Sequence, residues 1–229
     1  RPGAMTEYIA LHWNDVFVST ILSLKALALV EPLTVGFHAA ARGRVSQDDT
    51  VAVIGCGMVG LGALASAVHR GAKTIAIDVD ESKLAIAKKI GASHVIQSNI
   101  NNLHDTLMEI TGGDGPDVII EAVGSPITYR TAVEEVAYTG RVVCIGYAKS
   151  PVEFNTGLFV RKEIEILGSR NCTTEFPEVI QYLEEGRFPI DEVISKTVSI
   201  DDAGEALASW ADDPKGIIKI MVNFNQPDA

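Results

Sequence analysis

The chain has 229 residues, of which 47% are hydrophobic and 21% are charged. This composition is typical of a soluble globular protein of one or two domains and unlike that of a disordered chain. Nineteen basic residues against thirty acidic ones give a formal net charge of −11. Such a charge argues against nucleic acid or anionic membrane lipid as a partner, because both need a basic surface.

The three cysteines, Cys56, Cys144 and Cys172, are odd in number and widely spaced. They indicate neither a disulfide framework nor a metal-binding CxxC pair, so we expect a reducing, cytoplasmic location. The most apolar long stretch, residues 21–41, is interrupted by charged residues and a proline. A spanning helix needs about 20 nearly uninterrupted apolar residues, so we expect no membrane span. No secretory signal is visible and the chain begins without methionine, which indicates a piece of a longer protein.

The middle of the chain alternates short apolar runs with amphipathic stretches. The pattern predicts six strands, at residues 50–55, 74–78, 93–97, 117–121, 141–146 and 163–167. Between them it predicts helices at residues 58–70, 80–90, 103–111, 128–137 and 156–161. Strands that are apolar on both faces and joined by helices imply a doubly wound α/β fold with a parallel sheet covered on both sides.

The two ends of the chain show a different pattern. Residues 1–32 have the character of short strands that lead to Pro32. Residues 173–229 predict two helices, at 177–185 and 201–210, and a terminal strand at 216–224. We therefore expect a central α/β domain between two segments of another kind.

A GxGxxG motif, Gly55-Cys56-Gly57-Met58-Val59-Gly60, lies between the first predicted strand and its helix. In this context Gly55 allows a tight turn, Gly57 lets the backbone approach a pyrophosphate, and Gly60 lets the helix pack closely on the strand. The helix N-terminus offers free N–H groups and partial positive charge to phosphates. A packing turn without a ligand is the alternative, and the strand–helix context favours a dinucleotide site.

Asp78 ends the second predicted strand, 18 residues beyond Gly60. A carboxylate there accepts hydrogen bonds from the adenosine ribose hydroxyls and repels a 2′-phosphate, and no arginine follows closely, so we expect NAD rather than NADP. Asp80 is the rival acid, but its place before a helix favours a capping role. Lys83 lies one turn into that helix, where it either reaches the ribose or is an exposed surface lysine.

The histidines form neither an HxxxH nor an HExxH pattern. We therefore interpret each as a surface or packing residue rather than a metal ligand: His12, His38, His69, His94 and His104.

Besides the GxGxxG motif, Asp78 and Lys83, four further stretches are distinctive. They are residues 3–8 (GAMTEY), 29–36 (LVEPLTVG), 144–147 (CIGY) and 167–171 (LGSRN). With this succession the whole chain resembles the zinc-dependent medium-chain alcohol dehydrogenases, in the branch of sorbitol, threonine and sugar-acid dehydrogenases. Residues 147–171 are most similar to L-galactonate or L-gulonate 5-dehydrogenases. The resemblance implies an NAD-binding Rossmann domain at residues 33–170, between remnants of a GroES-like catalytic domain at residues 1–32 and 171–229.

The resemblance also implies roles for individual residues. Glu31 takes a position whose glutamate binds the catalytic zinc, directly or through its water; the alternative is a structural acid at the start of a helix. Arg170 contacts substrate, unless it forms only a surface ion pair. The cofactor-binding positions are Val59, Asp78 and Lys83 on the adenosine and pyrophosphate side, and Ile145, Gly146, Tyr147, Ser169 and Asn171 around the nicotinamide.

The activity implied is NAD-dependent oxidation of a secondary alcohol on a small polyol or sugar acid, by a homo-oligomer (dimer or tetramer), with zinc in the full-length enzyme. The family's zinc-ligand cysteine and His-Glu pair are absent from this sequence. A nucleotide-binding fragment without turnover of its own is therefore the alternative. A zinc-free quinone-type reductase is a third possibility, against which the acid in Glu31-Pro32 counts.

Overall fold

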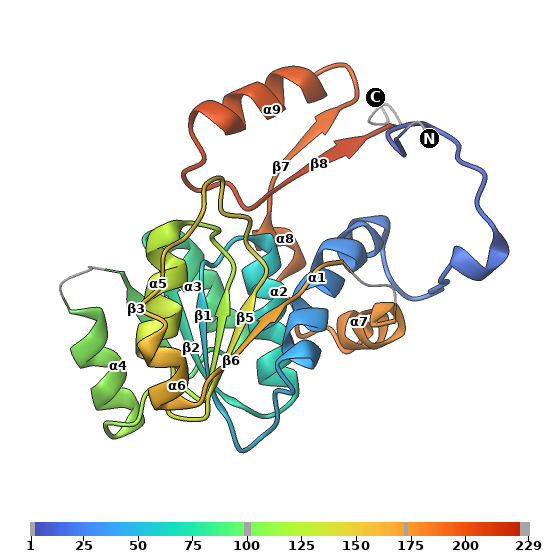
Figure 1. Cartoon of the computed structure of the whole chain (residues 1–229). Coiled ribbons are helices and arrows are strands. Elements are labelled where there is room, and N and C mark those ends of the chain that lie inside the picture. Colours follow the sequence, from blue (N-terminus) through green and yellow to red (C-terminus); the bar gives the residue numbers. More distant parts are fainter. Residues whose placement is uncertain (1–2, 99–101, 172–173, 225–229) are drawn as a thin grey trace.

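The computed structural model describes residues 3–98, 102–171 and 174–224 (Figure 1). Its centre is a six-stranded parallel sheet with the strand order β3-β2-β1-β4-β5-β6. This is the order of the doubly wound dinucleotide-binding fold, and it confirms the predicted sheet. The strands are β1 (Thr50–Ile54), β2 (Lys73–Asp78), β3 (His94–Gln97), β4 (Val118–Glu121), β5 (Arg141–Cys144) and β6 (Glu165–Gly168).

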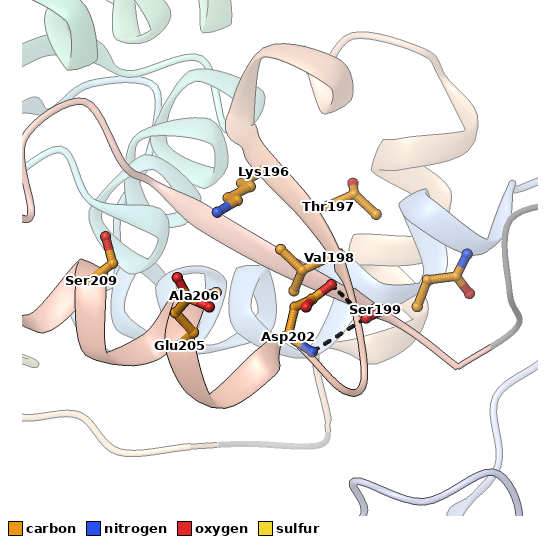
Figure 2. Close-up of a pocket in the computed structure, with 9 residues that line it drawn as sticks. Lys196, Thr197, Val198, Ser199, Asp202, Glu205, Ala206 and Ser209 are labelled. Atoms are coloured by element: carbon orange, nitrogen blue, oxygen red, sulfur yellow. Dashed lines mark hydrogen bonds between the residues drawn. The ribbon is translucent and has the colours of Figure 1, made fainter.

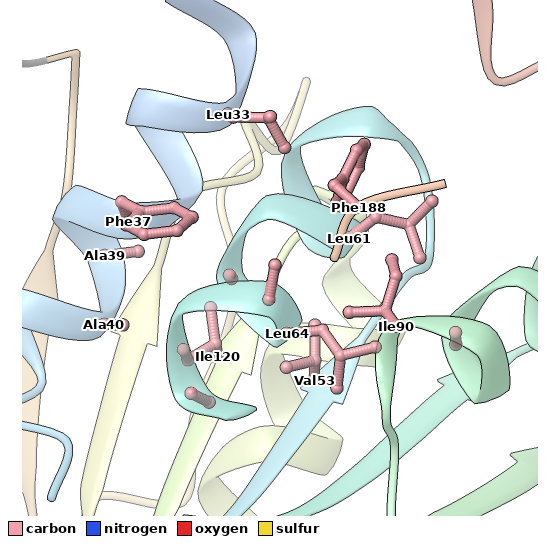
Figure 3. Close-up of a cluster of buried hydrophobic side chains, with 14 of the residues drawn as sticks. Leu33, Phe37, Ala39, Ala40, Val53, Leu61, Leu64, Ile90, Ile120 and Phe188 are labelled. Carbon is pink, nitrogen blue, oxygen red and sulfur yellow. The ribbon is translucent and has the colours of Figure 1, made fainter. Parts of the chain in front are cut away.

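Helices cover both faces of the sheet, so both faces are buried. Successive side chains of each strand point to opposite faces and therefore belong to different cores. On one face Val51 and Val53 belong to a core with α1 (Leu24–Arg42), α2 (Met58–His69), α3 (Glu81–Ile90) and α7 (Phe176–Glu184) (Figure 3). On the other face Ala52 and Ile54 pack with α4 (Leu103–Thr111), α5 (Pro126–Glu135) and α6 (Gly157–Lys162). The central strands therefore read as continuous apolar runs, as the sequence indicated.

Helix α3 shows how local signals set the element ends. The side chain of Asp80 accepts a hydrogen bond from the backbone N–H of Ser82 at 2.9 Å, which confirms its capping role. Gly91 ends the helix with φ of 115°, a left-handed conformation that glycine adopts without strain.

Helix α1 corrects the prediction for the N-terminal segment. Pro32 lies inside this helix, so Glu31 is helical rather than the last extended residue before it. A proline in a helix interior costs about 3 kcal/mol, but burial of Leu29, Leu33 and Phe37, none of them exposed, contributes about 1.5–3 kcal/mol each. Packing therefore outweighs the missing hydrogen bond. The domain boundary placed after residue 32 falls within this one helix.

The same helix is the one described segment with the length and composition of a membrane span. Half of its apolar window is buried within the protein, and it packs extensively against α2 and α7. This burial is what a core helix requires, and α1 belongs to the sheet domain.

The remaining described segments flank that domain. Before α1 there is only a short 3₁₀ turn, η1 (Trp13–Asp15), and residues 3–23 contain no strand, so the short strands expected there are absent from the described chain. After α7 come α8 (Ile190–Val193), β7 (Ile194–Ser199), α9 (Ala203–Asp212) and β8 (Lys219–Asn223). Strands β7 and β8 pair in a separate two-stranded parallel sheet, apart from the six-stranded one (Figure 1). The sequence reading missed β7.

Candidate cofactor site

The three motif glycines lie where β1 turns into α2, and each has a different geometric reason. Gly55 has φ of 97°, which a side chain would strain. A Cβ on Gly60 would lie 1.8 Å from the carbonyl oxygen of Gly55, so only glycine allows this helix-to-turn contact. A Cβ on Gly57, at the N-cap of α2, would meet no atom within 4 Å. Gly57 is thus not required by packing, and the space above it is open.

Asp78 lies at the carboxyl end of β2 and faces this turn. One carboxylate oxygen accepts the backbone N–H of Cys56 at 2.6 Å and the other accepts that of Asp80 at 2.9 Å. The carboxylate therefore joins the glycine-rich turn to the end of β2. Burial, followed by the charge of Asp78, raises the pKa of the Cys56 thiol well above its usual range, so this cysteine stays protonated.

A cavity of about 340 Å³ opens beside these groups. Gly55, Gly57, Asp78 and Lys83, four of the predicted cofactor residues, line it together. Val59 and Gly60 are not among its described lining, and Gly60 instead packs behind the turn. The cavity lies at the carboxyl ends of the strands, where ligands of doubly wound sheets bind.

The structure adds lining residues that the sequence reading missed. They come from the ends of β1, β2, β3 and β4 and from α5: Ile54, Ile77, Val79, Ser98, Ala122, Val123 and Thr128. Val79 and Val123 are 73% and 52% exposed, so both present apolar surface at the cavity. The signal that points to them is their position in the sequence, since Val79 directly follows β2 and Val123 is the second residue after β4.

The predicted nicotinamide positions follow β5 and β6 at the same edge of the sheet. The N–H of Ile145 donates to the carbonyl oxygen of Glu121 at 2.9 Å, and that of Ser169 donates to the carbonyl oxygen of Cys144 at 2.9 Å. The hydroxyl of Tyr129 donates to the carbonyl oxygen of Gly146 at 2.5 Å. The side-chain oxygen of Ser169 is buried and has no hydrogen-bond partner among the described residues.

The polar groups beneath this edge are kept protonated. Burial, with smaller contributions from Cys144 and Glu121, raises the pKa of the Tyr129 hydroxyl to about 12. Burial and the charge of Glu121 raise the pKa of the Cys144 thiol to about 11. Neither group ionises near neutral pH, so both act as hydrogen-bonding and packing groups there.

The remaining predicted residues stand at the surface. Tyr147 is 74% exposed, and Arg170 and Asn171 are exposed after β6. Arg170 forms no ion pair with a described residue. These residues lie at the same carboxyl-end edge of the sheet as the cavity, but they are not among its described lining.

Glu31 is exposed on α1, and its surroundings do not fit a metal centre. Within residues 3–98, 102–171 and 174–224, no three His, Cys, Asp or Glu side chains gather as a ligand set. Catalytic zinc normally takes three protein ligands, so the described residues do not supply a zinc site. Two of the histidines pair with carboxylates, His38 with Glu175 at 2.9 Å and His104 with Glu135 at 2.8 Å, whereas the buried Nδ1 of His69 has no hydrogen-bond partner among the described residues.

A second cavity, of about 580 Å³, lies between β7, β8 and α9 (Figure 2). Its lining mixes one cation, Lys196, with Asp202 and Glu205, and the hydroxyl of Ser199 is already bonded to Asp202 at 2.7 Å. None of the predicted site residues is in its described lining. Its described lining has no glycine-rich turn, and the α9 N-terminus that it includes carries Asp202 and Glu205, whose charges repel a phosphate group. The cavity beside β1 and β2 is therefore the candidate cofactor site.

The strand order and the helices on both faces of the sheet define a Rossmann domain. Residues 58–185, more than half of the chain, match the family model described as zinc-binding dehydrogenase. The chain belongs to this family of oxidoreductases.

Relatives in the family are alcohol and polyol dehydrogenases. The chain is 30% identical over 227 residues to a sorbitol dehydrogenase of Bacillus subtilis, covering 98% of this chain and 64% of the relative. It is 32% identical over 211 residues to an L-idonate 5-dehydrogenase of Vitis vinifera, covering 89% of this chain and 57% of the relative. The chain thus spans less than two thirds of the length of these relatives.

A solved structure shares the fold. It is described as a short chain alcohol dehydrogenase from Escherichia coli CFT073 complexed with cofactor NADH. The TM-score is 0.82 at 26% sequence identity, covering 90% of this chain and 61% of the other.

Proposed function

We propose that this chain binds NAD in the cavity between β1, β2 and β4, as the cofactor domain of an alcohol dehydrogenase. The observation that carries the proposal is Gly57, where a Cβ meets nothing within 4 Å although the glycine stands at a helix N-terminus. Packing gives no reason for a glycine there, whereas a pyrophosphate approaching the free N–H groups of α2 does. The space that a side chain would take is the space the phosphates need.

The adenosine half fits the rest of the cavity. Asp78 stands at the end of β2, where its carboxylate accepts the two ribose hydroxyls. Val79 and Val123 present exposed apolar surface at the same cavity, and the flat faces of adenine suit such walls. Exposure of these two valines is otherwise unfavourable, so a bound ring would stabilise the protein as well as hold the cofactor.

The charge balance around the ribose favours NAD over NADP. A neighbouring cavity of about 360 Å³ shares Lys83 and adds Lys215. Against these two cations stand Asp78 in the first cavity and Asp80 and Glu81 in the second. A 2′-phosphate would bring two negative charges close to three carboxylates, whereas a ribose hydroxyl donates a hydrogen bond to Asp78.

The substrate class follows from the relatives, a sorbitol dehydrogenase and an L-idonate 5-dehydrogenase. We propose a small secondary alcohol, a polyol or a sugar acid. NAD, when bound, would supply the acceptor for the hydride from the carbinol carbon, and the hydroxyl proton would pass to solvent. The part of this chain is to bind and orient the cofactor. The backbone after β5 and β6 holds the nicotinamide half, and Arg170 lies at the same edge, where it contacts the substrate.

The zinc named by the family is not assigned to the described residues, because they offer no ligand set. Glu31 as a zinc ligand in the longer protein stays a proposal. The same observation favours a second function for the chain by itself, a nucleotide-binding unit without turnover. A cytoplasmic location and assembly as a dimer or tetramer remain predictions from the family resemblance.

The test is calorimetric titration of the purified chain with NAD and NADP. We expect NAD to bind more tightly than NADP, and Asp78→Ala to weaken NAD by about 1–3 kcal/mol, the range of charge-assisted hydrogen bonds. Asp78→Asn keeps the shape of the side chain and removes its charge, so it should reduce the difference between the affinities for NAD and NADP. Asp114→Ala removes an exposed acid outside the cavity and is the matched control. Equal affinity of the unaltered chain for both cofactors would contradict the proposal.

A further inference from the structure

Glu121 is a fully buried carboxylate that the proposed function does not use. It is the last residue of β4, and its side chain has no exposed surface. One oxygen, Oε1, accepts the N–H of Val123 at 3.0 Å and of Gly124 at 2.8 Å, and the hydroxyl of Thr128 at 2.7 Å. Three donors on one oxygen fix the turn between β4 and α5.

The other oxygen, Oε2, is buried and has no hydrogen-bond partner among the described residues. It lies against Gly146, where a Cβ would come within 2.8 Å of it. A buried carboxylate oxygen without a hydrogen-bond partner destabilises the folded state, and by more than an unpartnered neutral polar group does. A residue kept at that cost does something that an apolar side chain would not do.

The main chain of Glu121 holds a second segment. Its carbonyl oxygen accepts the N–H of Ile145 at 2.9 Å and of Gly146 at 3.2 Å, just beyond β5. Glu121 therefore contacts two turns, residues 122–128 through its side chain and residues 145–147 through its backbone.

The two turns also touch each other directly. A Cβ on Gly146 would lie 2.2 Å from the nitrogen of Gly124, and a Cβ on Gly124 would lie 2.6 Å from the nitrogen of Tyr147. The backbones can approach this closely only because both residues are glycines. A shift of Gly124 therefore moves the segment after β5, because no side chain lies between them to absorb it.

We propose that Glu121 is a positioning residue, which sets the segment after β5 against the turn that lines the adenosine cavity. The inference rests on the proposed NAD function and deepens it. Without the Glu121 side chain the adenosine half loses the support of one wall, Val123 and Thr128, but it keeps the glycine turn and Asp78, which β1 and β2 hold. The nicotinamide half of the cofactor site depends on residues 145–147. When the Glu121 side chain no longer holds Gly124, these residues shift and the nicotinamide half loses its geometry.

The experiment compares NAD with ADP-ribose, which lacks the nicotinamide, on the full chain by calorimetry. Glu121→Ala should weaken NAD about tenfold more than it weakens ADP-ribose, the scale of one hydrogen bond. Glu121→Gln keeps an acceptor oxygen and the side-chain volume, so it should recover most of that loss. Glu109→Ala removes an exposed carboxylate on α4 and should change neither affinity.

A merely structural role predicts a different result, an equal loss for both ligands together with a lower melting temperature. If Glu121→Ala does not fold, Tyr129→Phe tests the same segment. This variant removes the hydroxyl that donates to the carbonyl oxygen of Gly146 and leaves Glu121 in place. It should weaken NAD more than ADP-ribose, by a few-fold.

The outcomes separate the two proposals. If ADP-ribose does not bind the unaltered chain, the cofactor site itself is wrong. If ADP-ribose binds but the variants lose both ligands equally, or neither, the positioning role of Glu121 is overturned. It is likewise overturned if NAD binds the unaltered chain no better than ADP-ribose.

Discussion

The sheet domain and the segments that flank it bury their apolar residues very differently. In β1 and β4 every residue is buried or nearly so, whereas β7 and β8 are mostly exposed or half-buried. The N-terminal segment shows the contrast most clearly, since many large apolar side chains there are exposed: Met5, Tyr8, Ile9, Leu11, Trp13, Val16, Val18, Ile21 and Leu24. The sheet domain is a complete packing unit, and its flanks are not.

The contrast has a consequence for substitutions. In the sheet domain backbones approach to contact distance, so a single methyl group matters. In the flanks there is room, and the same change should have little effect.

Gly60→Ala should have the largest effect on folding. Its Cβ would lie 1.8 Å from the Gly55 carbonyl oxygen, a backbone atom that cannot move aside. We expect the free energy of unfolding to fall by about 3 kcal/mol or more, as measured by urea titration. Gly57→Ala is the matched control, because its Cβ meets nothing within 4 Å. It should leave stability nearly unchanged and weaken NAD, and a stable Gly60→Ala would contradict the close contact.

The next largest effect concerns an ion pair at the opposite, amino-terminal end of the strands. Arg141 at the start of β5 donates to Asp49 just before β1, and the two side chains are 16% and 9% exposed. Arg141 also donates to the carbonyl oxygen of Gly43 at 2.8 Å. Asp49→Asn leaves the guanidinium poorly paired in a largely buried place, so we expect a loss of about 2 kcal/mol.

An exposed ion pair that joins α1 of the sheet domain to α8 of the C-terminal flank provides the comparison for that ion pair. Lys25 and Asp191 lie 3.2 Å apart, but their side chains are 54% and 84% exposed. Asp191→Asn should therefore change the unfolding free energy by less than about 0.5 kcal/mol. Neither change should alter NAD affinity, because both pairs lie outside the cofactor cavity. Equal losses for the two variants would remove the distinction between domain and flank.

Much of this molecule is predictable from sequence where the signal is local. The glycine motif, Asp78 and the cap at Asp80 each depend on a few consecutive residues, and the structure places them as expected. Parallel strands are also recognisable, because burial on both faces leaves continuous apolar runs. The predicted roles of these residues toward NAD remain proposals.

The failures arise where contacts between distant segments decide. Pro32 indicated the start of a helix, but the buried face of α1 overrides it. Strand β7 carries Lys196 and other exposed residues, so its apolar pattern is too weak to read. Val123 lines a cavity formed by four strand ends, Glu121 is buried at the end of β4 beside it, and no short motif marks either residue.

Gly204→Ala tests the flank from the opposite direction. Gly204 lies in the first turn of α9, is exposed, and a Cβ there would meet nothing within 4 Å. Alanine is a better helix former than glycine by up to about 1 kcal/mol, and less near a helix end. We expect a gain of about 0.5 kcal/mol or a change too small to detect. A clear loss in a thermal melt would show that this flank is packed more tightly than its exposure indicates.

The smallest expected effect is a pH dependence on the outer surface of the sheet domain. The hydrogen bond that His104 donates to the carboxylate of Glu135, followed by the charge of that carboxylate, raises the pKa of His104 above the ordinary value of 6.5. His104 lies on α4 and Glu135 on α5, so the pair joins two helices on one face. Because the folded pKa is the higher one, the pair contributes its full stabilisation below the unfolded pKa. That contribution is lost as the pH rises through the folded pKa. An NMR titration of His104 measures the shift, and Glu135→Gln should return its pKa toward 6.5. An unchanged titration in that variant would show that Glu135 does not hold the proton on His104, and that this exposed pair behaves like the solvated one between Lys25 and Asp191.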